Sequence, residues 1–186
     1  MESESKSENK NINYKANDVI LYATHGVCEI VEVAEKDLRG TPIEYYVLKP
    51  LYYDKCTIYV PVANEELVAK MRRLLSVSNI YALIEAMPDE GAVWTEDENE
   101  RTEKYKEILE RGDRTELVKL VKSLWHHQQS QRSKGKRLSC TDDRFMKDAE
   151  KMLYEEFAHV LDIKREQVLP FIIERIRVRE KRKSGR

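Results

Sequence analysis

The hydrophobic pattern of the chain changes abruptly at residues 88–91, where Pro, Asp, Glu and Gly follow one another. Between residues 18 and 62, short stretches rich in Val, Ile and Tyr partly alternate apolar and polar side chains, which is typical of β-strands. After residue 95, apolar residues recur at helical spacing instead. We therefore predict two domains of different classes, an all-β N-terminal domain and an all-α C-terminal domain, joined at this segment.

The N-terminal domain is predicted to be a small antiparallel barrel of the SH3 or Tudor type over residues 15–88, because several short strands are joined by tight turns. The expected strands are DVILYA (18–23), VCEIVEVAEK (27–36), IEYYVLKPL (43–51) and KCTIYVPV (55–62). A short strand in KMRRLL and a helix across SNIYALIEAM complete the domain. Residues 1–14 read as a disordered leader without the apolar core of a signal peptide.

The C-terminal domain, residues 92–186, is predicted to be a helical bundle with a basic tail. The first helix starts with Thr95 as N-cap, with Glu98 as its capping-box partner, and ends at Gly112. The second starts at Asp113, and the third starts near Thr141. The fourth contains VLPFIIERI, in which Pro170 marks a first turn or a kink. The second helix carries one apolar stripe, which predicts that its members are core residues: Leu117, Leu120, Val121, Leu124 and Trp125.

Charge is distributed unevenly although the net charge is only −1. Residues 1–90 hold 10 Lys and Arg against 15 Asp and Glu, whereas residues 91–186 hold 23 against 19. This asymmetry favours an anionic partner for the back half. Three widely spaced cysteines fit a reducing cytoplasm, where we expect the protein to reside. No apolar stretch reaches the length of a membrane span.

No catalytic or cofactor motif is recognisable, so we predict neither an enzyme nor a cofactor or small-molecule site. His25 and Cys28 form a single H-x-x-C pair, but a zinc site needs four converging ligands. We therefore predict no metal site, with His25 as a turn residue and Cys28 as a small core side chain.

Trp94 stands between a Gly-containing linker and a run of acidic residues. As the residue before the expected N-cap, its ring should pack on the helix it precedes, yet Asn99 and Glu100 occupy that neighbourhood. Without a local partner, Trp94 is either packed between the domains or kept for another molecule.

Arg101 and Lys104 share a helix face near Trp94, and Lys106 points away from them. Further positive charges complete a candidate phosphate-binding surface, whose alternative is a charged, solvated helix surface: Lys134, Lys136, Arg137, Arg144 and Lys147.

The chain resembles the CarD family of bacterial transcription regulators, whose N-terminal module is related to the RNA-polymerase-interacting domain of transcription-repair coupling factor. In the front half the matching residues are Asp18-Val19-Ile20, Tyr22, His25-Gly26, Gly40, Glu44 to Lys49 and Val60-Pro61. In the back half they are Trp94, Arg101, Tyr105, Leu109, Gly112-Asp113, the string LVKLVKSLW, Leu138-Ser139, Ala149, Leu153 and Glu156.

This resemblance implies that the barrel docks on the lobe of the RNA polymerase β subunit. The helical domain then reaches promoter DNA at the upstream edge of the transcription bubble, largely independently of sequence. There Trp94 matches a tryptophan that wedges into the minor groove and stabilises the open complex. For polymerase contact we expect Lys36, Arg39, Lys49 and Tyr59, with Tyr59 standing where the family has an arginine.

The chain departs from the family pattern in having TEDENE between Trp94 and Arg101, where relatives place basic residues beside the wedge. Residues from 164 onward exceed the usual family core. Two other readings remain open. One is a protein-only adaptor with Trp94 buried between the domains, and the other is a small enzyme built on the bundle, for which no pocket can be located from the sequence.

Overall fold

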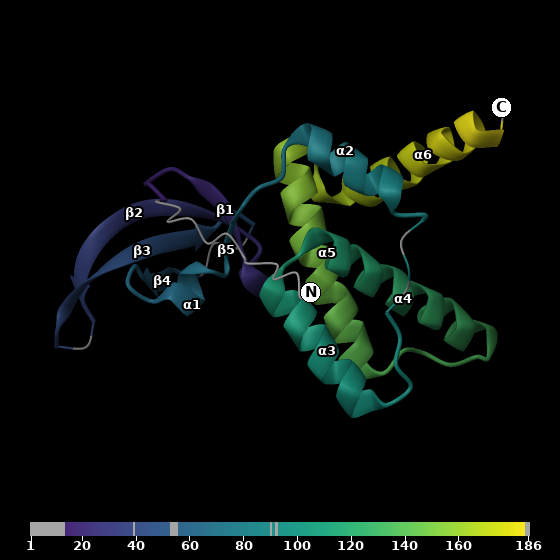
Figure 1. Ribbon diagram of the computed structural model, residues 1–186, viewed down its shortest axis with the longest axis horizontal. Coiled ribbons are helices and arrows are strands. Elements are labelled where there is room, and N and C mark those ends of the chain that lie inside the picture. Colours follow the sequence, from purple (N-terminus) through teal and green to yellow (C-terminus); the bar gives the residue numbers. More distant parts are fainter. Residues whose placement is uncertain (1–13, 39, 53–55, 90, 92, 185–186) are drawn as a thin grey trace, which may run out of the picture.

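The computed structural model describes residues 14–184 apart from 39, 53–55, 90 and 92 (Figure 1). Residues 1–13 of the predicted leader lie outside the described residues. Its last residue, Tyr14, is 3% exposed, and its hydroxyl donates a hydrogen bond to the carbonyl of Met71 at 2.7 Å. Tyr14 is thus part of the N-terminal core.

The described chain begins with strands and ends with helices, as the change of hydrophobic pattern predicts. The N-terminal elements are β1 (Val19–Tyr22), the 3-10 turn η1 (Ala23–His25), β2 (Val27–Asp37), β3 (Pro42–Pro50), β4 (Ile58–Pro61), α1 (Glu65–Val68) and β5 (Met71–Arg73). The helices that follow are α2 (Val77–Ala86), α3 (Glu98–Arg111), α4 (Arg114–Ser133), α5 (Cys140–Leu161) and α6 (Arg165–Ser184). None of the described helices is long and apolar enough to cross a membrane.

The N-terminal strands form one antiparallel sheet in the order β4-β3-β2-β1-β5. The sheet is open, which corrects the predicted closed barrel: among the described residues no ladder joins β4 to β5. These edge strands have only four and three residues, and α1 connects them. Leu67 and Val68 of α1 pack on the sheet core, so a helical turn covers the space that a closing ladder would need.

The two faces of β1 and β2 serve two different cores, because successive side chains of a strand point to opposite sides. Ile20 and Tyr22 belong to the core of the sheet, whereas Leu21 between them belongs to the core of the helices. Cys28 and its neighbour Val27 divide in the same way. The predicted burial of Cys28 is confirmed. Burial raises the pKa of its thiol to about 12, which keeps it protonated.

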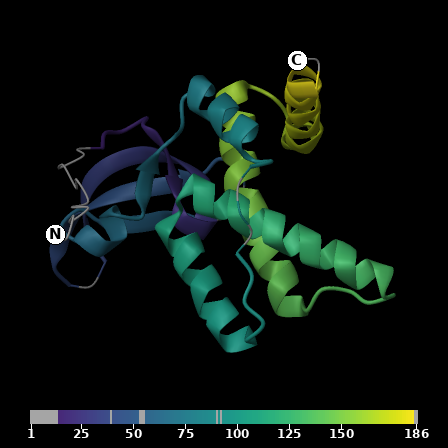
Figure 2. The ribbon, with the colours of Figure 1, turned by 45° about the vertical axis from the view of Figure 1, so that its right-hand side comes forward.

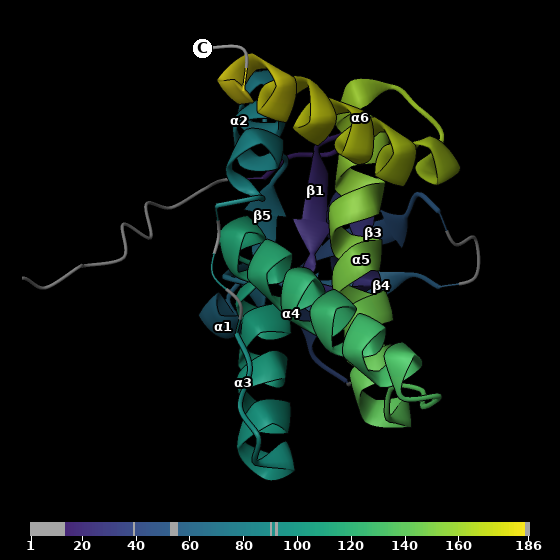
Figure 3. The same cartoon turned by 90° about the vertical axis from the view of Figure 1, so that its right-hand side faces the viewer.

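Helix α5 is the centre of the helical domain, since α2, α3, α4 and α6 all contact it. Figure 3 shows α4 crossing α5 and α6 crossing one end of it, and Figure 2 shows the same helices turned, with α6 seen nearly along its axis. Ile80 and Ile84 of α2 are fully buried in this helical core. A helix that precedes residues 88–91 therefore packs with the helices that follow. Helix α6 continues through Pro170, which lies inside the helix and beyond its first turn.

Two buried glutamates of α5 hold the sheet against the helices. Glu155 accepts a hydrogen bond from the backbone N–H of Val27 in β2 at 3.2 Å. Glu156 accepts one from the N–H of Leu75 at 2.8 Å and binds the Arg114 guanidinium through both carboxylate oxygens at 2.9 and 3.0 Å. Arg114 also donates to the carbonyl of Arg73 in β5. These bonds fix the orientation of the two domains.

Candidate nucleic-acid interface

Trp94 lies in the segment between α2 and α3 and is half-buried against the helical core. Its ring stacks on the imidazole of His127 in α4, with centroids 3.9 Å apart and planes inclined by 22°. The guanidinium carbon of Arg101 lies 4.4 Å from the ring centroid. The indole N–H donates to the Glu96 carboxylate at 3.0 Å. The expectation that Trp94 has no local partner is therefore wrong, because three side chains brace the ring.

The side chain of Arg101 contacts the segment that carries Trp94 and is only 7% exposed. Its Nε lies 3.2 Å from Oδ1 of Asp142, which is itself 4% exposed at the start of α5. Its Nη1 donates to the carbonyl of Thr95 at 2.8 Å and to that of Glu96 at 3.3 Å. With its donors used inside the protein, Arg101 is built to position the segment that carries Trp94.

The segment is also tied down on both sides of Trp94. Lys122 of α4 donates to the carbonyls of Met87 and Pro88 at 3.2 and 3.0 Å. Ser123, one residue on, accepts a hydrogen bond from the N–H of Val93, and the hydroxyl of Tyr105 donates to the carbonyl of Val93 at 3.4 Å. Burial, together with the nearby Asp142 carboxylate, raises the pKa of Tyr105 to about 12, so its hydroxyl stays a donor.

The acidic run after Trp94 begins helix α3 two residues later than predicted. Asp97, not Thr95, is the N-cap, and its carboxylate accepts the N–H of Glu100 at 2.8 Å. Asp97 is the better cap here because a carboxylate also complements the positive end of the helix dipole. Two residues of the TEDENE insertion thus have structural partners, Glu96 with the indole and Asp97 with the helix start.

Trp125, which the apolar stripe assigns to the core, is 48% exposed. The described buried residues of α4 end at Leu124. Figure 1 shows the second half of α4 projecting beyond its neighbours, so the stripe continues where no other element covers it. The expectation for Trp125 is thereby corrected, since this residue of the stripe is exposed. Trp94, which lies outside any stripe, is half-buried.

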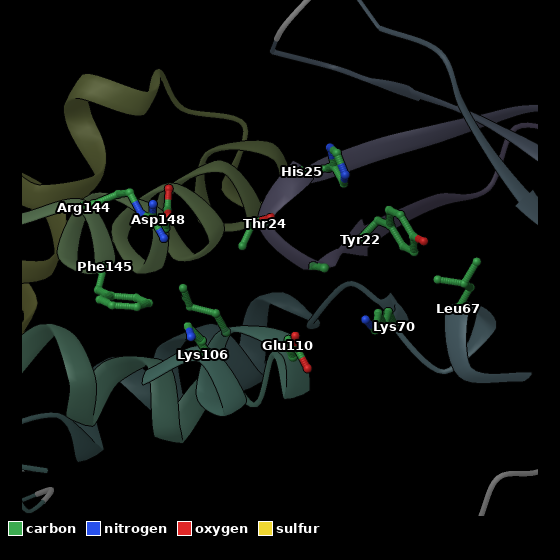
Figure 4. A pocket seen from close by; sticks show the side chains of 12 residues that line it. Tyr22, Thr24, His25, Leu67, Lys70, Lys106, Glu110, Arg144, Phe145 and Asp148 are labelled. Carbon is green, nitrogen blue, oxygen red and sulfur yellow. The ribbon is translucent and has the colours of Figure 1, made fainter. Parts of the chain in front are cut away.

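Of the predicted DNA-binding cations, Arg101 contacts the Trp94 ring. Lys106 and Arg144 instead face a pocket of about 440 Å³ between the sheet and helices α3 and α5, together with His25 and Lys70 (Figure 4). Burial, aided by the charge of Lys151, lowers the pKa of His25, which lies in η1 as predicted for a turn residue. The remaining predicted cations are exposed: Lys104 on α3, Lys134, Lys136 and Arg137 between α4 and α5, and Lys147 on α5, which pairs with Asp143.

Three of the four residues predicted for polymerase contact lie on described strands of the sheet. Tyr59 is 41% exposed on the edge strand β4, with its ring edge-on to Tyr45. Lys49 is exposed on β3, and Lys36 near the end of β2 pairs with Glu32 at 2.7 Å. Arg39 lies outside the described residues. Since β4 pairs only with β3 among the described strands, its outer edge can accept another strand.

Sequence reasoning missed His127, Ser123 and Glu96 as partners of the Trp94 segment. Ser123 and His127 are four residues apart, which places them on one face of α4. This spacing can be read from the sequence, but an analysis of hydrophobic periodicity considers apolar residues only and so passes over Ser123 and His127. Nothing in the local sequence indicates which segment that face contacts.

Comparison with protein families gives two matches along the chain. Residues 14–75 match the CarD-like/TRCF RID domain. Residues 82–172 match the CarD C-terminal domain. The first match covers the sheet and α1, and the second runs from within α2 into the first half of α6.

Proposed function

The chain belongs to the CarD family, and from this membership we propose that it is a cytoplasmic transcription regulator without enzymatic activity that links RNA polymerase to promoter DNA. CarD-family domains indicate regulation of transcription through contact with RNA polymerase. The finer proposal is that the N-terminal sheet binds the polymerase β subunit. The helical domain binds DNA at the upstream edge of the bubble, where Trp94 enters the minor groove.

The polymerase contact is proposed to use the β4 edge of the sheet. Exposed Tyr59 offers a flat aromatic surface there, and Lys49 and Lys36 add positive charge. An edge strand can extend a partner's sheet through backbone hydrogen bonds, while side chains on either side supply specificity. Tyr59→Ala should therefore weaken binding to the isolated β-subunit lobe. Lys104→Ala, on α3, serves as the control that leaves this binding unchanged.

The observation that carries the DNA proposal is the bracing of Trp94 by Arg101 and His127. A ring that is already oriented loses little conformational freedom on binding, so more of its contact energy remains for opening a base step. Inserting an apolar side chain costs unstacking, which is smaller where the duplex is already melting. Trp94 is thus suited to hinder the closing of a bubble more than to open one.

The test is the lifetime of the open complex on a promoter in the presence of polymerase. Wild-type protein should lengthen this lifetime, and Trp94→Ala should abolish the effect. Trp125→Ala removes the other, exposed tryptophan and should behave as wild type. If Trp94→Ala prolongs the complex as well as wild type does, the wedge proposal is wrong.

A protein-only adaptor remains a second candidate, because Trp94 is half-buried and has three partners within the chain. In that case Trp94→Ala lowers the thermal stability but leaves the DNA-dependent activity intact. Direct DNA binding separates the two candidates. A DNA-binding protein should show weak affinity that is insensitive to sequence and falls steeply with salt, since phosphate contacts release counterions. An adaptor should show no such dependence.

A further inference from the structure

The C-terminal half of α6 carries six cationic side chains against one acidic side chain, Glu180. We call the six the α6 basic surface: Arg175, Arg177, Arg179, Lys181, Arg182 and Lys183. All six lie after residue 172, where the match to the CarD C-terminal domain ends. The family match therefore says nothing about what this surface does.

Five of these residues line a groove of about 660 Å³, and Glu85 of α2 is the acidic residue among its lining side chains. Arg175 is half-buried, with its guanidinium carbon 4.2 Å from the centroid of the Tyr81 ring. Stacking fixes the plane of a guanidinium while its N–H groups remain able to donate. The groove is thus a charged surface with at least one cation held in a defined orientation.

Ion pairs neutralise only part of the α6 basic surface. Arg179 and Lys183 both pair with Asp89, the latter at 3.6 Å. The hydrogen bond from Arg179 is the main cause of the lowered pKa of the Asp89 carboxyl. Arg177, Lys181 and Arg182 are exposed, and none forms an ion pair with an acidic residue in the described part of the chain.

Stabilisation of the helix end does not account for the whole surface. Cations in the last turn of a helix interact favourably with its dipole, but the effect falls off within that turn. Lys181, Arg182 and Lys183 lie in the last turn of α6. Arg175 and Arg177 lie further back, so the helix dipole does not account for their position.

The α6 basic surface lies close to the segment that carries Trp94. Asp89, which Arg179 and Lys183 bind, precedes Trp94 by five residues, so their Cα atoms are at most about 18 Å apart. Figures 1 and 3 show the chain leaving α2 beside α6 and crossing α4 toward the start of α3.

We propose that the α6 basic surface binds the phosphate backbone of duplex DNA next to the base step that Trp94 enters. This inference rests on the proposed function and extends its DNA contact to a second site. Phosphate contacts carry no sequence information, but they fix the register and orientation of a protein on the duplex. The α6 basic surface would thus orient the wedge through a contact that the family match does not contain.

The experiment compares salt dependence of binding to a duplex of about three helical turns (~30 bp), measured by fluorescence anisotropy with the full chain and without polymerase. The variant is Lys181→Gln/Arg182→Gln, which removes two exposed cations. Each lost phosphate contact should reduce the slope of log affinity against log salt by about 0.9. We therefore expect a slope smaller by about 2, with equal loss of affinity for unrelated sequences.

Two control variants make the result specific. Lys15→Gln/Arg73→Gln removes two exposed cations on the sheet side of the molecule and should leave the slope unchanged. Lys181→Arg/Arg182→Lys keeps the charge and should keep the slope. An unchanged slope in Lys181→Gln/Arg182→Gln overturns the proposal, as does an equal decrease in the sheet variant. Loss of polymerase binding at an unchanged slope would instead assign the surface to an acidic protein segment.

Failure of this inference is distinguishable from failure of the proposed function. The wedge is tested by Trp94→Ala on open-complex lifetime, whereas the α6 basic surface is tested on duplex DNA alone. If the open complex lives as long with Trp94→Ala as with wild type, the measurement of binding to duplex DNA still stands. If Lys181→Gln/Arg182→Gln has the wild-type slope of log affinity against log salt, the effect of Trp94→Ala on open-complex lifetime still stands.

Discussion

His127 of α4 stacks on Trp94 in the segment between α2 and α3, so the orientation of the Trp94 ring depends on how α4 packs. A stacked aromatic pair contributes about 0.5–1.5 kcal/mol beyond the area it buries. The neighbouring His126 instead contacts Trp125, with centroids 5.2 Å apart and planes inclined by 73°. The two adjacent histidines therefore contact two different tryptophans. A substitution of one histidine can serve as the control for a substitution of the other.

We predict that His127→Ala loosens Trp94. In a Trp125→Phe background, acrylamide quenching of the remaining Trp94 fluorescence should increase, and the unfolding free energy should fall by about 0.5–1.5 kcal/mol. His126→Ala in the same background should change neither. Equal quenching in the two variants would mean that the stacked pair does not hold the ring.

Gly26 is a second residue whose role is set by a contact across the domains. A Cβ at this position would lie 1.9 Å from Oε2 of Glu155, and its φ is +82°. Gly40 has nearly the same φ, +84°, but a Cβ there meets nothing within 4 Å. Gly26 also has a ψ of −149°, a combination that is essentially restricted to glycine, so a side chain there meets both a backbone cost and a close approach.

Gly40→Ala should lower the unfolding free energy by about 1–2 kcal/mol, the cost of a side chain in the left-handed region. Gly26→Ala should cost more, because it also displaces Glu155 from the Val27 N–H at a further ~1–3 kcal/mol. Urea denaturation of the two variants measures the difference. An equal decrease in unfolding free energy for the two variants would show that the Glu155 side chain moves aside at no cost.

At the scale of elements, helix α3 depends on the acidic residues that separate Trp94 from Arg101. Asp97 caps the helix, and Arg101 in its first turn returns to the carbonyls of Thr95 and Glu96. The helix start and the Trp94 segment are therefore one hydrogen-bonded unit. The insertion acts as a support for the ring in addition to adding negative charge.

Asp97→Ala should lower the unfolding free energy by about 1 kcal/mol, the usual cost of losing an N-cap. Thr95→Ala should stay within about 0.5 kcal/mol, since no cap is lost. Thermal unfolding followed by circular dichroism measures both changes. A larger loss for Thr95→Ala than for Asp97→Ala would restore Thr95 as the cap.

At the scale of the whole molecule, the sheet and the helices meet in a seam that contains buried charge. Glu156 is fully buried, and Arg114 supplies its compensating charge while bonding to β5. Leu21 and Val27 add apolar contacts across the same seam. A rigid seam would fix the distance between the proposed polymerase contact and the proposed DNA contact.

Arg114→Met should destabilise the protein by about 3–5 kcal/mol, because it leaves the Glu156 carboxylate buried without its partner. Arg111→Met breaks an exposed pair with Glu107, 3.9 Å apart, and should cost no more than about 1 kcal/mol. Chemical denaturation compares the two, and hydrogen exchange in β1 and β5 should rise only in Arg114→Met. Similar small effects would argue against a rigid seam.

Apart from the short helix α1, the sequence by itself determined which strands and helices form and in what order. Alternation in residues 18–62, the Asp113 cap and the Gly112 stop act over a few residues, so local patterns are sufficient to predict them. Asp113 caps α4, and Gly112 ends α3 in the left-handed conformation. The family resemblance also followed from residues alone, and the domain matches confirm it.

Only the tertiary structure decided what surrounds each side chain. The stripe on α4 could not show that the helix projects beyond its neighbours, which leaves Trp125 exposed. The basic character of Arg101 could not show that its guanidinium forms a buried ion pair with Asp142. Burial depends on contacts between residues far apart in the sequence, and those contacts exist only once the helices have packed. Trp94 owes its bracing to the same packing.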